Sequence, residues 1–139
     1  MGQPERPGTA HGGYIDFEDV VRDARAGNPL APEENLRYRT HWNLRHDDDG
    51  TMRLKYDARV QAHWEPADLT AKLPFIPCPT LLVRGGKTTV LSEERAAAMV
   101  AAMPDADLIE IPASGHSVPT DTPELLTPIV MDWLASRPA

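Results

Sequence analysis

Apolar runs and helical patterns alternate through the second half of the chain, and this order restricts the fold to few possibilities. Residues 80–83 form a continuous apolar run, which is typical of a parallel strand buried on both faces. A helical pattern over 92–103, a second apolar run over 108–111 and a helical pattern from Pro123 follow. Because short links join these elements, they predict a right-handed β-α-β-α unit with a small parallel sheet.

The first half of the chain carries two helical patterns. Asp16 precedes an apolar stripe at helical spacing, so we expect a helix to begin there, with Ile15 packing on Val20. Gly27, Asn28 and Pro29 should end that helix. A second helix is expected to begin at Pro32 and to continue through Leu44.

The remainder of the first half predicts shorter elements. Asp48, Asp49 and Gly50 indicate a turn. Apolar and charged residues then alternate over 52–56, the pattern of a short half-exposed strand. A further short helix is expected over 66–73.

The composition argues against several classes of function. The chain has 21 acidic and 14 basic residues, so its net charge of −7 repels phosphate backbones, and we expect no nucleic-acid partner. A single cysteine, Cys78, excludes an internal disulfide and a multi-cysteine metal site, and we expect it to be a buried small apolar residue. No apolar run approaches 18 residues and the N-terminus is polar, so we expect no membrane span and a cytoplasmic location. We also expect no cofactor and no metal.

One histidine stands where a parallel sheet places chemistry. His116 follows Gly115 in the loop over 112–121, directly after the second apolar run. Ligands and catalytic groups gather at the carboxyl ends of parallel strands. Imidazole titrates near neutral pH, so a histidine there can take a proton from a nucleophile and return it to a leaving group. On position alone, an ordinary surface-loop histidine fits equally well.

The second half of the chain resembles the C-terminal part of an α/β-hydrolase. The resemblance lies in "IPCPTLLVRGG", "LSEERAAAMVAAMPDADLIEIPASGHSVPTDTPELL" and "VMDWL". It implies that the run over 80–83 is the penultimate strand and that His116 is the triad histidine. The stretches "DFEDVVRDARAGNP" and "RHDDDGTMRLKYDARV" are similar to the helical lid that family members insert before that strand.

The resemblance therefore implies a fold of the α/β class, a partial α/β-hydrolase fold with a helical lid segment ahead of the β-α-β-α unit. We expect three parts, divided by residue number. They are a flexible lead-in over 1–13, a lid or cap segment over 14–73 and a C-terminal hydrolase segment over 74–139.

Two parts of the family's site have no counterpart in this sequence. The nucleophile of the family lies on a Gly-x-Ser-x-Gly elbow. None of the chain's serines stands in that frame: Ser92, Ser114, Ser117 and Ser136. The family's acid commonly follows the penultimate strand, where this chain has Thr88 and Thr89, and threonine can hydrogen-bond an imidazole but cannot neutralise it. Glu93 and Asp121 are alternative acids, although we favour both as helix-start charges.

Other polar groups support weaker alternatives. We interpret His11-Gly12-Gly13 as linker, and Asp47 to Gly50 as a solvated turn that lacks the spacing of a calcium loop. His41 and His46 fall on different faces of a helix and predict no metal site. His63-Trp64 fits packing or a pocket wall under the lid. Two other aromatic residues, Tyr38 and Trp42, fit a pocket wall and core packing equally well.

These observations predict a hydrolase-family chain that contributes His116 but is inactive alone. The implied substrates are esters, epoxides or similar small apolar molecules, and family relatives include esterases, epoxide hydrolases and non-haem haloperoxidases. One half of a split hydrolase and a non-catalytic binding module remain alternatives. Because the strand over 80–83 leaves an unpaired sheet edge, we expect that edge to pair with a second chain or in a homo-oligomer.

Overall fold

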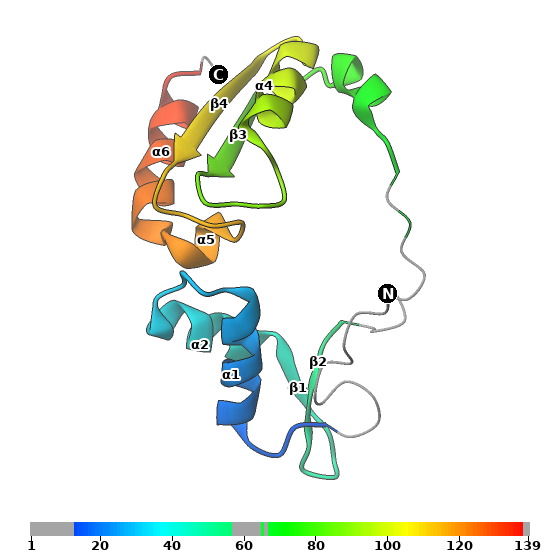
Figure 1. Ribbon diagram of the computed structural model, residues 1–139, viewed down its shortest axis with the longest axis vertical. Helices are drawn as coiled ribbons and strands as arrows, with labels where there is room; N and C mark the ends of the chain where they lie inside the picture. Colours follow the sequence, from blue (N-terminus) through cyan, green and yellow to red (C-terminus); the bar gives the residue numbers. More distant parts are fainter. Residues whose placement is uncertain (1–12, 57–64, 66, 138–139) are drawn as a thin grey trace. The chain divides into compact units, whose positions relative to one another are not determined.

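The computed structural model of the 139-residue chain describes residues 13–56, 65 and 67–137. Its contacts divide the chain into two compact units, Met1–Pro66 and Ala67–Ala139 (Figure 1). This division, after residue 66, lies earlier in the chain than the boundary that we expected after residue 73. Nearly all of the expected lead-in lies outside the described residues.

The first unit begins with the predicted helix α1, Phe17–Gly27. The Asp16 side chain caps it by accepting a hydrogen bond from the Glu18 amide at 2.8 Å. The expected contact of Ile15 with Val20 is wrong, because Ile15 is 85% exposed. Tyr14 and Phe17 instead pack against a cluster of buried side chains that includes Val20.

The second helix, α2, spans Glu33–Trp42 and is shorter than predicted. Leu36 and Thr40 are its buried residues. Leu44 is not part of the helix. It pairs with Leu54 across a hairpin instead. The backbone hydrogen bonds of this antiparallel pair take the place of those that a further helical turn would make.

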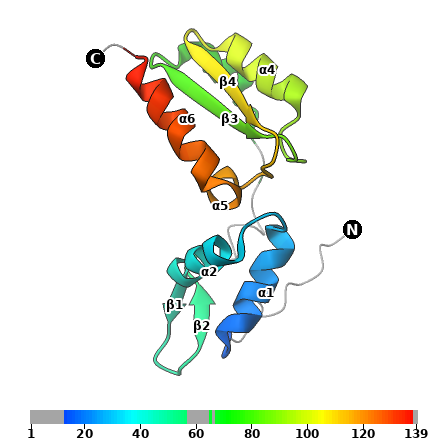
Figure 2. The ribbon, with the colours of Figure 1, turned by 90° about the vertical axis from the view of Figure 1, so that its left-hand side faces the viewer.

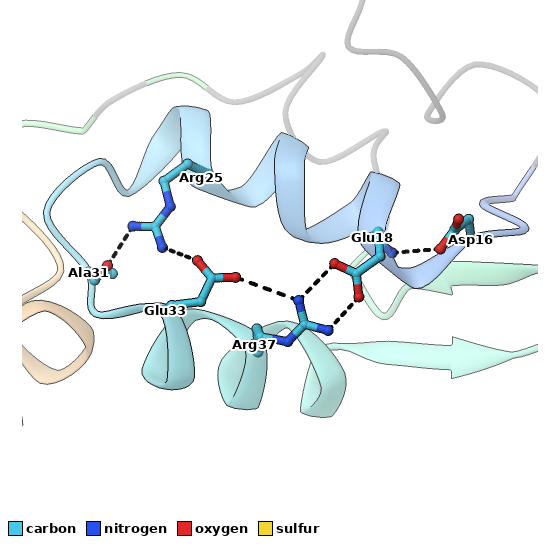
Figure 3. A network of polar contacts seen from close by, with 6 residues as sticks. All are labelled: Asp16, Glu18, Arg25, Ala31, Glu33 and Arg37. Carbon is cyan, nitrogen blue, oxygen red and sulfur yellow. Dashed lines mark hydrogen bonds and ion pairs between the residues drawn. The ribbon is translucent and has the colours of Figure 1, made fainter.

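An ion-pair network joins α1 to α2 (Figure 3). The Arg37 guanidinium binds both carboxylate oxygens of Glu18 and lies 3.5 Å from Glu33. Arg25 binds Glu33 from the other side at 2.7 Å. The hydrogen bond from Arg37 lowers the pKa of Glu18, and the same bond raises the pKa of Arg37. Because these groups are exposed to solvent, the network contributes little stability beyond fixing the pairing of the helices.

A short hairpin completes the described part of the first unit. Strands β1, Leu44–His46, and β2, Met52–Leu54, pair antiparallel. The predicted turn lies between them, and Gly50 adopts the left-handed φ of 81° that favours glycine. Asp47 forms ion pairs with Arg45 and Arg53, so its carboxylate braces the hairpin.

The second unit is built on two parallel strands. β3, Thr80–Gly85, pairs with β4, Ala106–Ile111, in the order that the sequence predicted. Helix α4, Glu93–Ala102, connects them and is capped by Ser92, whose hydroxyl accepts from the Arg95 amide at 3.2 Å. Figures 1 and 2 show α4 on one side of the sheet and α6, Pro123–Ala135, on the other.

Three expectations for the second unit are wrong. β3 is only half-buried up to Arg84, because one neighbouring strand and parts of two helices cannot cover both of its faces. Cys78 is exposed rather than buried. A 3-10 helix, η1, spans Thr70–Phe75, later than the helix that we expected at 66–73, and it packs on α4.

Buried apolar side chains are unequally shared between the units. In the first unit they form two clusters: Val20, Leu44 and Met52, and Val21, Ala31 and Leu36. In the described part of the second unit, Ala96, Ile111 and Val118 are the buried apolar residues. No helix among the described residues is long and apolar enough to cross a membrane.

Candidate active site

Two glycines allow the loops after β3 and β4 to approach each other closely. A Cβ atom on Gly85 would lie 1.8 Å from the Gly115 carbonyl oxygen, and one on Gly86 would lie 2.7 Å from Pro112 Cα. Backbone hydrogen bonds fasten the same approach: the Gly86 amide donates to Ile111 O and the Lys87 amide to Ser114 O, both at 2.9 Å. Only glycine fits at residue 85, and the loops therefore meet at the carboxyl end of the sheet.

This approach brings His116 next to Thr88. The Thr88 hydroxyl oxygen lies 3.4 Å from Nδ1 of His116, and it also accepts a hydrogen bond from the Val90 amide at 3.2 Å. The contact is long for a hydrogen bond. A hydroxyl can donate to Nδ1 or accept from it, so it tolerates both tautomers of the imidazole. His116 itself is exposed, while Ser114 and Gly115 before it are buried.

Arg84 braces the loop that carries Thr88. Its side chain is only 10% exposed and forms an ion pair with Glu110 on β4. Its Nε atom donates to the Leu91 carbonyl oxygen at 2.9 Å. Both ends of the loop over 86–91 are therefore tied to the sheet, one by backbone bonds and the other by a nearly buried cation.

Asp121 lies behind the histidine loop. It ends the one-turn helix α5, Val118–Asp121, and it is buried. Its Oδ2 atom accepts a hydrogen bond from the Gly115 amide at 2.9 Å. The interpretation of Asp121 as a helix-start charge therefore misses its main contact. Glu93 does lie in the first turn of α4 and is exposed, as expected of such a charge.

The other sequence candidates form no site with His116. The His41 ring contacts Trp42 and Phe17, and His46 lies in β1. Tyr38 and Trp42 are 69% and 58% exposed, so core packing does not explain them. Within the described ranges no three His, Cys, Asp or Glu residues are placed to hold a metal ion. Two candidate stretches, His11-Gly12 and His63-Trp64, lie outside the described residues.

A hollow of about 720 Å³ occupies the first unit. Its walls combine apolar side chains with a few polar ones, among them Tyr14, Asp23, Arg39, Lys55 and Tyr56. Four of these polar groups already have partners: Tyr14 donates to Asp23, Arg39 to Asn28 and Lys55 to the Trp42 carbonyl. Neither Tyr38 nor Trp42 lines this hollow.

No family model and no curated protein matches the chain. Solved structures do. An esterase from Mycobacterium tuberculosis is 26% identical with a TM-score of 0.72, and the match covers 91% of this chain and 44% of that one. E-2-(acetamidomethylene)succinate hydrolase is 21% identical with a TM-score of 0.74 over 88% of this chain and 47% of that one. An alpha/beta hydrolase from Novosphingobium aromaticivorans is 22% identical with a TM-score of 0.62, covering 85% and 45%.

These matches show that the chain has part of the α/β-hydrolase fold. It spans less than half the length of the solved hydrolases that it matches. The predicted partial fold, a helical segment followed by a β-α-β-α unit with a small parallel sheet, is confirmed. The catalytic role of His116 stays a prediction.

Sequence reasoning found His116 and Thr88 but missed the two groups that hold their loops. Arg84 had a local signal, since it is a charged residue at the end of an apolar strand. Buried cations need partners, so an acidic residue on the neighbouring strand could have been sought. The contact of Asp121 with Gly115 had no such signal, because it depends on the path of the backbone through α5.

Proposed function

We propose that the chain completes a hydrolase active site by supplying His116 as its general base. The observation that carries this proposal is the meeting of His116 and Thr88 across the ends of two parallel strands, at 3.4 Å. Backbone hydrogen bonds and close glycine contacts join the loops after β3 and β4, so the backbone that carries the imidazole is held in place. The nucleophile and the oxyanion hole would come from polypeptide outside this sequence.

In the proposed reaction, Nε2 of His116 takes the proton from the nucleophile and later returns it to the leaving group. For that, the Nδ1 atom must carry the ring's proton. Thr88 can accept this proton in a hydrogen bond, but its neutral hydroxyl cannot stabilise the imidazolium that forms. Loss of such an acid costs on the order of 10⁴ in turnover in a well-studied triad. We therefore expect slow hydrolysis unless the missing polypeptide supplies a carboxylate.

The proposed substrate is a small apolar ester, an epoxide or a similar molecule. The similarity to an esterase at 26% identity supports the ester among these. The free edge of β3 is the proposed attachment point for the missing strands, because β3 pairs only with β4 in the described part of the chain. The partner is a second chain or the remainder of the fold, and we propose a cytoplasmic location.

A chimera tests the proposal. The part of the Mycobacterium tuberculosis esterase that lies outside its match to this chain is fused ahead of residue 13, and hydrolysis of a short-chain aryl ester is measured. A His116→Ala chimera and the chain alone are the controls. We expect slow hydrolysis by the chimera and none by either control. A chimera that melts cooperatively but is silent, or that is unaffected by His116→Ala, contradicts the proposal.

One observation favours a second function, a non-catalytic interaction module. A threonine stands at Nδ1 of His116, where a working triad needs a charge. In that case the unit would keep the hydrolase scaffold as a binding surface. A cooperative but silent chimera, together with tight association of the two parts, is the result that this alternative predicts.

A further inference from the structure

A buried carboxylate contacts the residue before the proposed general base. Asp121 is only 5% exposed, and both Thr122, which follows it, and Ser114, which precedes Gly115, are also buried. A buried carboxylate needs compensating hydrogen bonds, since taking its charge out of water is costly. Oδ2 has one, from the Gly115 amide at 2.9 Å, while Oδ1 has no partner among the described residues.

The backbone of α5 makes this contact rigid. The Asp121 and Thr120 amides donate to the Ser117 carbonyl oxygen at 2.9 and 2.8 Å. Val118, one turn earlier, is buried and anchors the helix. The hydrogen bond between the Gly115 amide and the Asp121 side chain therefore closes the segment from 115 to 121. The backbone bonds of α5 close its second part, from 117 to 121. His116 lies inside the wider of these two closed segments.

The contacts of Asp121 do not fit an ordinary helix-start charge. Such a side chain is exposed and bonds to amides in the first turn of its helix. The first turn of α6 has no side-chain cap, and its Leu125 and Leu126 amides bond to the Thr122 carbonyl oxygen. Asp121 instead accepts a hydrogen bond from Gly115, the residue that precedes His116.

We propose that Asp121 is a positioning residue for His116. Its carboxylate fixes the Gly115 peptide, and this holds the imidazole with Nδ1 facing the Thr88 hydroxyl. The inference rests on the proposed function of His116 as the general base. It assigns Asp121 a support role rather than a contact with substrate, and it accounts for a buried charge that packing alone does not require.

Nuclear magnetic resonance of the ¹⁵N-labelled chain tests the inference without a substrate. Two signals are followed: the exchange rate of the Gly115 amide and the ring-nitrogen shifts of His116, identified by their loss in His116→Gln. In Asp121→Ala we expect exchange of the Gly115 amide to become about tenfold faster or more, as for loss of a hydrogen bond to a charged acceptor. The ring shifts should move towards those of an unrestrained imidazole.

Conservative and control variants separate positioning from stability. Asp121→Asn keeps an acceptor oxygen for Gly115 and should restore both signals. Thr122→Val removes a neighbouring buried hydroxyl that has no partner among the described residues, and it should change neither signal. If Asp121→Ala does not fold, Asp121→Leu supplies a folded comparison because its side chain fills the same space.

A purely structural Asp121 would lower the melting temperature but leave the His116 ring shifts of the folded chain unchanged. That result, in either the Ala or the Leu variant, overturns the inference. It leaves the proposed function standing, because the chimera assay is read with Asp121 intact. A silent chimera whose His116 shifts respond to Asp121 rejects the proposed function and keeps the positioning role.

Discussion

The imidazole of His116 meets a hydroxyl at the position where the resemblance implies a carboxylate. A carboxylate can only accept from Nδ1, so it selects the tautomer that leaves Nε2 as a base. The Thr88 hydroxyl selects neither tautomer, and its oxygen is shared with the Val90 amide. Whether His116 is held in the tautomer that a general base needs therefore depends on the side chain of residue 88.

Thr88→Asp should convert the ring to a single tautomer. The new carboxylate would accept a hydrogen bond from the Nδ1–H group, which faces the Thr88 hydroxyl at 3.4 Å in the present chain, and Nε2 would become the unprotonated nitrogen. The ring ¹⁵N shifts of His116 at pH 8 measure this directly. The matched control is Thr89→Asp, which adds the same charge at an exposed neighbouring residue. Equal shifts in both variants would show that charge alone, rather than contact, is responsible.

A second prediction concerns the glycine that lets the loops meet. Gly85→Ala should destabilise the second unit by at least about 2 kcal/mol, because its Cβ would meet a backbone oxygen that cannot move aside. Gly27→Ala is the control, since its Cβ meets nothing within 4 Å, and it should be neutral or stabilising by up to about 1 kcal/mol. Urea unfolding followed at Trp133 and Trp42 compares the two units. A neutral Gly85→Ala would show that the loops can separate at little cost.

At the scale of elements, the end of α6 is fastened to the start of β4 by charge. The Trp133 indole donates to Asp107 at 2.7 Å, and Arg137 binds both Asp107 and Asp105. The Arg137 guanidinium also lies over the Trp133 ring, 4.8 Å from its centre. These contacts connect a helix without any fully buried residue to a half-exposed strand.

This contact should open in acid. The Trp133 hydrogen bond, and after it Arg137, lower the pKa of Asp107 below its usual 3.8. A lowered carboxyl pKa stabilises the folded state above pH 3.8, and that contribution is lost as the pH falls through the lowered value. The Trp133 indole signal should therefore titrate in that acid range. Asp107→Asn should abolish the titration, whereas Asp132→Asn, on the same helix, should leave it intact.

The helices and the parallel strands were predictable because their signals are local. Asp16 and Ser92 cap helices where their sequence positions indicate, and the apolar runs became β3 and β4. β1 was missed because its three residues become a strand only by pairing with β2. The burial of β3 was overestimated because it depends on neighbouring strands, which no pattern inside β3 encodes.

The candidate site divides in the same way. His116 and Thr88 could be placed together, since the carboxyl ends of parallel strands meet at one edge of the sheet. The contact of Asp121 with Gly115 could not be predicted, because a four-residue helix and the preceding loop decide its direction. The sequence therefore indicates which side chains could meet at the site, while the contact of Asp121 with Gly115 depends on the path of the backbone.

At the scale of the whole molecule, the two units differ in how completely they bury their own apolar surface. The first has two clusters of buried side chains. The second exposes apolar residues in η1, in the loop after β3 and in α6, including Phe75, Val90 and Met131. Parallel sheets are normally covered on both faces and flanked by further strands. This exposed apolar surface fits the attachment that we propose at the free edge of β3.

The second unit should accordingly unfold first and should be the one that a complementary polypeptide stabilises. In urea, the Trp133 signal should be lost at a lower concentration than the Trp42 signal. Adding the unmatched part of the Mycobacterium tuberculosis esterase at 100 times its dissociation constant should raise the unfolding free energy of the second unit by about 2.7 kcal/mol. The Trp133 midpoint should then move to higher urea, while the Trp42 midpoint stays unchanged. An unrelated protein at the same concentration is the control. Coincident midpoints that do not respond to the esterase segment would mean that the free edge of β3 needs no neighbour, and the attachment proposed for it would then be wrong.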